Sequence, residues 1–125
     1  MKLKELKNFQ VPGFLAGGMA CGLKKKGIKD LALIVSEVPA TAAGVFTQNQ
    51  MVSPTVPISR KALKSSRTIR AIIANSGNAN AFTGPQGVKD CEAVVAATAK
   101  APCLRRGKDQ IRISASPAGR RSSPR

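Results

Sequence analysis

The chain has 125 residues, of which 42% are apolar, so it is long and hydrophobic enough for one domain with a core. It contains no Trp, Tyr or His, so the core must be aliphatic, histidine-based acid–base catalysis is excluded, and a zinc site is disfavoured. The net charge of +15 invites a role in binding polyanions, but residues 101–125 alone carry seven basic residues and one acidic residue, which leaves the rest of the chain only mildly basic.

The first ten residues form an arm in which lysines and a glutamate interrupt the apolar positions, with no apolar segment behind it. We therefore expect no secretory signal and a cytoplasmic protein, and no apolar run is long enough to cross a bilayer. Three cysteines are odd in number and lack paired spacing, so we expect buried free thiols at Cys21, Cys91 and Cys103. We expect neither a metal nor a cofactor.

The first part of the chain predicts strands separated by turns. Residues 14–23 are apolar but contain several glycines, which predicts a strand with close backbone packing or a bulge. Residues 24–27, Lys-Lys-Lys-Gly, predict a charged hairpin turn, with phosphate binding as the alternative to a solvated turn. Residues 30–36, with a continuous apolar run at 31–35, predict the clearest strand, and residues 45–47 predict a second strand that pairs with it in antiparallel fashion.

Prolines dominate the next segment. Pro54 and Pro57 predict that residues 52–58 are extended at a sheet edge, because proline is poorly tolerated inside a helix. Residues 59–65 predict one or two helical turns around two apolar side chains.

The chain is organised around residues 68–84. Residues 69–74 form a short apolar run, which predicts a strand buried on both faces. The run ends at a corner of small polar residues, and Thr83 then predicts a helix N-cap, with Gln86 completing a capping box. Free backbone N–H groups converge where a strand feeds a helix N-terminus, so the corner is a candidate ligand site; a loop that only turns the chain is the alternative. The candidate site-supporting residues are Asn75, Ser76, Gly77, Asn78, Asn80 and Thr83.

These patterns predict an α/β or α+β fold, with a mixed or antiparallel sheet and one main helix at about residues 84–100. The predicted buried stripe of that helix is Val88, Cys91, Val95 and Thr98. We divide the chain into an arm at 1–10, a domain at 11–100 and a basic Pro/Arg/Ser-rich tail at 101–125. A brief strand is predicted at 110–114, and the composition of the tail beyond it predicts disorder.

The residues by themselves define no mechanism. The six acidic side chains show no pairing of the kind that acid–base catalysis uses, and no phosphate-binding glycine motif has the required spacing. Cys21 and Cys91 have no base partner in the sequence pattern, which argues against a nucleophilic role.

A resemblance to a known family adds predictions that the residue patterns alone do not give. The sequence resembles the bifunctional ornithine acetyltransferase/glutamate N-acetyltransferase family of arginine biosynthesis, and the matching segments follow in family order with family-like spacing over residues 11–100. They read Val-Pro-Gly-Phe at 11–14, Asp-Leu-Ala-Leu-Ile-Val-Ser-Glu at 30–37, Ala-Thr-Ala-Ala-Gly-Val-Phe-Thr at 40–47, Arg-Ala-Ile-Ile-Ala-Asn-Ser-Gly-Asn-Ala-Asn-Ala at 70–81 and Thr-Gly at 83–84.

The resemblance implies acetyl transfer from N-acetylornithine to glutamate, with acetyl-CoA as a further donor in some members. It implies a precursor that cuts itself into α and β chains assembled as α2β2, a threonine nucleophile at the start of the β chain, and a Thr-Gly oxyanion pair. Neither the nucleophile nor the oxyanion pair has a counterpart here, so no catalytic residue is assigned and the fold is expected to be incomplete relative to the family.

Two expectations follow from that departure. The family's Thr-Gly-Val-Ile-Gly should follow residues 111–116, but the chain reads Pro-Ala-Gly-Arg-Arg at 117–121, so we hypothesise a frameshifted or truncated gene copy. Resequencing tests this, because an intact Thr-Gly motif in a neighbouring frame supports it. We expect the chain to be inactive alone, with a small basic polyanion-binding protein as the alternative.

Overall fold

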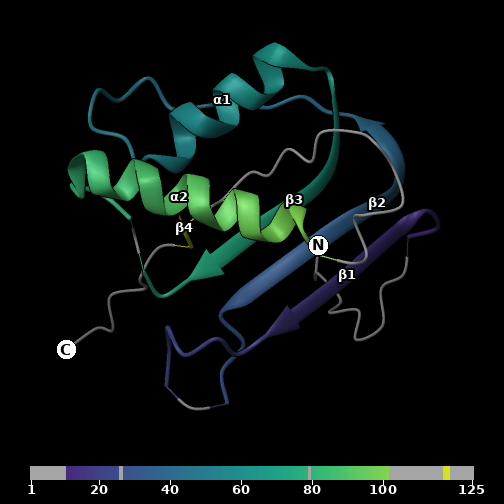
Figure 1. Cartoon of the computed structure of the whole chain (residues 1–125), viewed down its shortest axis with the longest axis horizontal. Helices are drawn as coiled ribbons and strands as arrows, with labels where there is room; N and C mark the ends of the chain where they lie inside the picture. Colours follow the sequence, from purple (N-terminus) through teal and green to yellow (C-terminus); the bar gives the residue numbers. More distant parts are fainter. Residues whose placement is uncertain (1–10, 26, 79, 102–116, 119–125) are drawn as a thin grey trace, which may run out of the picture.

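The computed structural model describes residues 11–25, 27–78, 80–101 and 117–118. One sheet has the strand order β1-β2-β3-β4, and two helices accompany it. Both β1–β2 and β2–β3 pair antiparallel, whereas β4 runs parallel to β3. The predicted mixed α/β class and the main helix are confirmed. The elements are β1 (Phe14–Met19), β2 (Leu31–Thr41), α1 (Thr55–Ser65), β3 (Thr68–Ser76), α2 (Gly84–Ala99) and β4 (Pro117–Ala118), and Figure 1 shows their arrangement.

The core lies on one face of the sheet. Val35 of β2 and Ala71 of β3 are buried against each other, and Leu33 and Ala101 pack against them. Figure 1 shows α2 lying across the sheet next to β3, while β1 has no helix over it in this view. Aliphatic and alanine side chains fill this core, as the composition requires.

The pairing predicted for β2 is wrong in part. Residues 45–47 form no strand; the antiparallel partners of β2 are β1 and β3. β2 also runs past the predicted strand and through Pro39 to Thr41, and its register against β3 shifts between Val35 and Ala40. A bulge removes the need for a ladder hydrogen bond at the proline.

The extended segment predicted at 52–58 is also wrong, because α1 already begins at Thr55. Pro54 is the N-cap residue, and Pro57 lies in the first turn. The N–H groups of a first turn have no acceptor within the helix, so a proline there costs no hydrogen bond. The prolines mark the start of a helix, and the turns predicted at 59–65 are its continuation.

The buried stripe of α2 is shifted from the prediction. Gly87 and Cys91 are buried, Val95 and Thr98 are half-buried, and Val88 is exposed. Cys91 is a free buried thiol as expected, but Cys21 is exposed, because it lies in the loop after β1 rather than in a packed element.

Several expectations fall outside the described residues. They concern the arm at 1–10, the strand at 110–114, Cys103 and the disorder of the tail, except that residues 117–118 form β4 where we expected no structure. Within the described part of the chain, no helix is long and apolar enough to cross a membrane.

Candidate functional site

The predicted corner between β3 and α2 begins with a turn closed by an amide side chain. The Nδ2 group of Asn75 donates a hydrogen bond to the carbonyl oxygen of Asn78, at 3.2 Å. Gly77 lies between them with a φ of 106°, a conformation that favours glycine. A Cβ at this position would lie 2.9 Å from Lys24 Cγ and 3.3 Å from the carbonyl oxygen of Leu23. The corner therefore needs glycine both for its backbone and for the close approach of the neighbouring loop.

Asn80 joins the corner to α2. Its Nδ2 group donates to the carbonyl oxygen of Gly87 at 3.0 Å and to the Sγ atom of Cys91 at 3.1 Å. Its Oδ1 atom accepts a hydrogen bond from the hydroxyl of Thr83 at 2.6 Å. Asn80 therefore fixes the corner against the first two turns of the helix.

The capping box predicted at the start of α2 is absent. Thr83 is the N-cap residue, but its side chain makes no cap hydrogen bond, and its φ of −95° and ψ of 1° are not the extended backbone of a typical cap. Gln86 instead donates from Nε2 to Oδ1 of Asp90 at 2.8 Å. The hydroxyl of Thr83 is directed to Asn80, which sequence reasoning did not foresee.

Gly87 is a structural residue that sequence analysis missed. A Cβ there would collide with Oγ1 of Thr83 and lie 2.7 Å from Oδ1 of Asn80. A glycine inside a helical pattern is the signal that could have found it, since such a glycine costs helix stability and needs a packing reason.

Asp30 is a second missed residue. It is buried at the start of β2, and its carboxylate accepts hydrogen bonds from the backbone N–H groups of Cys21 at 2.6 Å and Lys24 at 2.9 Å. Its carbonyl oxygen accepts the N–H of Ser76 at 2.8 Å. The hydrogen bond from the Cys21 N–H, followed by that from Lys24, holds the pKa of Asp30 well below its usual range. The carboxylate of Asp30 thus holds the loop at residues 21–24, and its carbonyl oxygen holds the end of β3.

Phe82 lies in the corner with an exposed side chain and a φ of 59°. A bulky residue in the left-handed region is strained, and such strain clusters at functional sites. The corner therefore presents an aromatic ring to solvent at a cost in backbone energy.

The structure brings the six predicted residues together in one corner, with Asn75 linked to Asn78 and Asn80 linked to Thr83. Whether any of them contacts a ligand stays a prediction.

The described residues contain no group of three potential metal ligands. The pKa of the Cys21 thiol is raised, mainly by its hydrogen bond to Asp30, which keeps the thiol protonated and a poor nucleophile. The corner offers hydrogen-bonding groups and an anchored backbone.

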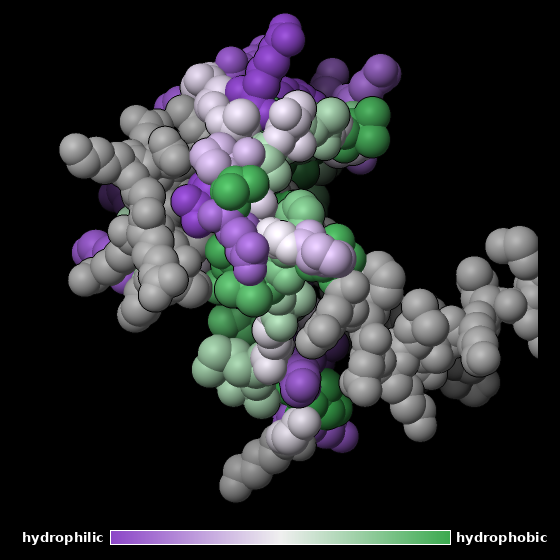
Figure 2. Space-filling view, turned by 90° about the vertical axis from the view of Figure 1, so that its right-hand side faces the viewer, coloured by the Kyte–Doolittle hydropathy of each residue, from purple (hydrophilic) through white to green (hydrophobic). Residues whose placement is uncertain are grey.

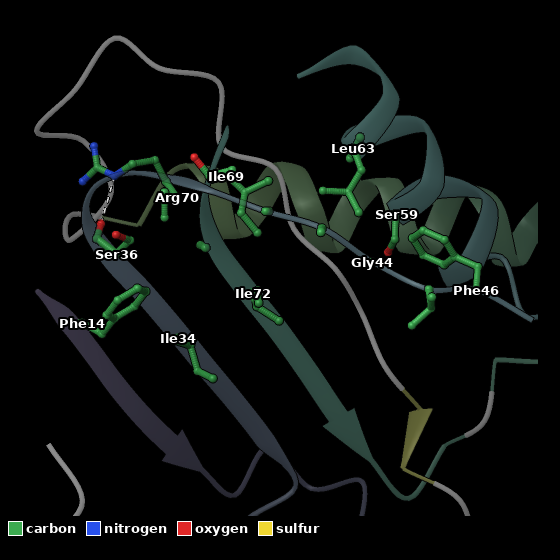
Figure 3. A pocket seen from close by; sticks show the side chains of 17 residues that line it. Phe14, Ile34, Ser36, Gly44, Phe46, Ser59, Leu63, Ile69, Arg70 and Ile72 are labelled. Carbon is green, nitrogen blue, oxygen red and sulfur yellow. Dashed lines mark hydrogen bonds between the residues drawn. The ribbon is translucent and has the colours of Figure 1, made fainter. Parts of the chain in front are cut away.

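A pocket of about 400 Å³ lies at one end of the sheet. Its walls come from β1, β2 and β3, from the segment at 40–46 and from α1 (Figure 3). The lining is mostly apolar, with Phe46 and Leu63 on the helix side and Ile34 and Ile72 on the sheet side. Arg70 lines the same pocket, and its Nε–H donates to the carbonyl oxygen of Ser36 at 3.0 Å.

The fold is a mixed α/β domain with its core on one face of the sheet. Strand β3 leads into the asparagine corner, which hydrogen bonds hold in place. The sequence model described as the ArgJ family matches residues 15–116. That match covers well over half of the chain, so the chain belongs to the ArgJ family, and the resemblance seen in the sequence is confirmed.

Curated relatives agree with this assignment. The arginine biosynthesis bifunctional protein ArgJ 1 of Nostoc sp. is 50% identical over 80 residues, which are 64% of this chain and 19% of the relative. The arginine biosynthesis bifunctional protein ArgJ of Thermosynechococcus vestitus is 55% identical over 75 residues, which are 60% of this chain and 18% of the relative. The chain thus spans about a fifth of the length of these relatives.

Solved structures share the fold. The arginine biosynthesis bifunctional protein ArgJ of Bacillus halodurans superposes with a TM-score of 0.72 at 32% identity, over 86% of this chain and 55% of that chain. Ornithine acetyltransferase from Mycobacterium tuberculosis, solved in complex with ornithine, gives a TM-score of 0.74 at 37% identity, over 90% of this chain and 58% of that chain.

Proposed function

We propose that this chain supplies the N-terminal part of the α chain of an acetyltransferase that moves an acetyl group from N-acetyl-L-ornithine to L-glutamate in arginine biosynthesis. The observation that carries the proposal is the asparagine corner, set in a fold that superposes on an ornithine acetyltransferase with a TM-score of 0.74. The proposed reaction needs no resident cofactor or metal, and acetyl-CoA, which the resemblance implies as a further donor in some family members, would be a substrate.

Within that enzyme, the corner has a positioning role. Asn80 and Thr83 bind each other and the first turns of α2, so their polar atoms are occupied within the chain. Groups held in this way fix the geometry of neighbouring residues that touch substrate.

The chemical step needs groups that this chain does not supply. The family resemblance implies a threonine nucleophile activated by its own amine, and a Thr-Gly oxyanion pair, with neither assigned to a position here. We therefore propose that the 125-residue chain is inactive alone and works in the cytoplasm only with a β chain, in an α2β2 assembly.

An acetyl-transfer assay tests this proposal. N-acetylornithine and glutamate are incubated with the purified chain alone, and with the chain co-expressed with the part of the Thermosynechococcus relative that lies beyond the matched 75 residues. We expect N-acetylglutamate to form only in the second case. Turnover by the chain alone, or none in either case, would overturn the proposal.

The net charge of +15 favours a second candidate, the binding of RNA or another polyanion through the basic turn at 24–26 and the basic tail. Affinity for RNA that falls steeply with salt and disappears when residues 101–125 are deleted would support this candidate. We expect weak binding without a loss specific to the tail.

A further inference from the structure

The exposed side of α1 carries a cluster of positive charge, here called the basic face. A shallow hollow of about 410 Å³ is lined by Pro57, Arg60, Lys61, Lys64 and Ser65, all of which are exposed. Their spacing of three and four residues places them on one side of the helix. Figure 2 shows hydrophilic surface at the top of the molecule, the level at which Figure 1 draws α1. Three cations thus share one side of an 11-residue helix.

No acidic side chain of α1 balances these cations. The sequence has no Asp or Glu between Glu37 and Asp90. Within the described part of the chain, the side chains of Lys61 and Lys64 have no carboxylate partner. Like charges three and four residues apart destabilise a helix. The helix dipole favours Lys64 in the last turn, but its effect does not extend to Arg60 and Lys61, which precede that turn. A bound anion would relieve the repulsion within the cluster.

Arg60 is already held in place on the basic face. Its Nη2 group donates a hydrogen bond to the carbonyl oxygen of Thr47 at 3.1 Å, and its guanidinium carbon lies 5.4 Å from the centre of the Phe46 ring. A guanidinium has five N–H donors, so this hydrogen bond leaves others for a ligand. A side chain fixed before binding loses less entropy when the ligand arrives, and the guanidinium fork fits phosphate oxygens. Lys61 and Lys64 add two point charges to the same hollow.

The dimensions of the basic face favour a small phosphate-bearing ligand over a nucleic acid. Arg60 and Lys64 are four residues apart, which is about 6 Å along a helix axis and spans one or two phosphate groups. None of the five residues that line the hollow is aromatic, and the guanidinium of Arg60 lies over the ring of Phe46. The basic face therefore offers no ring on which a base could stack, as proteins that bind single-stranded nucleic acids do. A pyrophosphate carries several negative charges and so complements three cations better than a single carboxylate.

We propose that the basic face of α1 binds the pyrophosphate group of a small ligand. The fork of Arg60 donates to one phosphate, and Lys61 and Lys64 pair with the remaining negative charge. Two kinds of molecule supply this group: coenzyme A, the carrier in acetyl-CoA, and a free nucleoside diphosphate. The inference goes beyond the proposed function, and its test reads binding by the chain alone and does not depend on turnover.

Isothermal titration calorimetry of the full 125-residue chain tests the proposal, with inorganic pyrophosphate as the first probe. Lys61→Gln/Lys64→Gln should weaken pyrophosphate binding about 20-fold, because two charge pairs are lost while the helix propensity is kept. Lys29→Gln/Lys89→Gln is the matched control, since it removes the same charge from two exposed lysines outside the basic face. In about 0.1 M salt, where the Debye length is about 10 Å, this control should change the affinity less than about twofold. Circular dichroism establishes that each variant is folded.

Arg60 and the source of the pyrophosphate have their own tests. Arg60→Lys keeps the charge but loses the fork and should weaken pyrophosphate binding about fivefold. ADP and coenzyme A distinguish the sources: the one that binds more tightly names the ligand, and either result supports the proposal if Lys61→Gln/Lys64→Gln weakens that binding too. Absence of binding by all three probes would overturn the proposal, as would equal weakening by the two double variants. Tighter binding of a single-stranded RNA oligomer that Lys61→Gln/Lys64→Gln abolishes would also overturn it.

Discussion

Ile72 and Ile73 are neighbours on β3 with opposite environments. Ile73 is 6% exposed on the face that packs beside α2, whereas Ile72 is 38% exposed on the opposite face of the sheet, here called the open face. The sequence analysis expected a strand buried on both faces, and only one of them is covered in the described structure. The comparison teaches that a continuous apolar run does not by itself report which faces of a strand are covered.

Truncating each isoleucine in turn gives the largest expected effect. Ile73→Ala should destabilise the chain by about 2–4 kcal/mol, because it leaves a cavity in the core, whereas Ile72→Ala should cost less than about 1 kcal/mol. Urea unfolding followed by circular dichroism measures both. Similar losses at the two positions would mean that the open face is already covered when the chain is alone.

Two glycine substitutions compare the packed and open faces again, with a smaller expected loss of stability. Gly87→Ala should destabilise by about 1–3 kcal/mol, because the new methyl group meets Thr83 and Asn80 on the braced side. Gly18→Ala on the open face is the control, since its Cβ would come no closer than 3.4 Å to the Leu31 carbonyl oxygen. Thermal unfolding of the two variants should show a lower melting temperature for Gly87→Ala alone. If Gly18→Ala were the more damaging change, the space assigned to the open face would be wrong.

The smallest expected effect is that of Asp30, whose contribution to the unfolding free energy depends on pH. Its pKa is lowered in the folded chain, so its stabilising effect is fully present above the unfolded value of about 3.9 and is lost as the pH falls below it. The difference in unfolding free energy between the native chain and Asp30→Asn should therefore be largest near neutral pH and shrink below about pH 4. A difference that stays constant between pH 7 and pH 3 would contradict the assigned hydrogen bonds.

The local sequence pattern was sufficient to predict those helices and strands whose residue types are characteristic over a short segment. The apolar run in β2, the glycine-rich β1 and the long alanine-rich α2 were all predicted close to their observed places. The start of α1 was missed because proline was interpreted by its usual helix-breaking effect, although Pro57 lies in the first turn, where no hydrogen bond is lost.

The sequence predicted which segment forms the candidate site but not the contacts within it. The polar corner was recognisable from its small residues and asparagines, but the contacts of Asn80 with Gly87 and Cys91 arise from packing on α2. The capture of the 21–24 loop by Asp30 likewise joins residues whose spacing carries no motif.

The most direct measurement compares acetyl transfer by the purified chain alone with acetyl transfer by the chain co-expressed with the remainder of the Thermosynechococcus relative. The proposed function predicts that N-acetylglutamate forms only with the co-expressed pair, because the nucleophile and the oxyanion pair that the family resemblance implies have no assigned position in this chain. Activity of the 125-residue chain without its partner, or no activity of the pair, would contradict it.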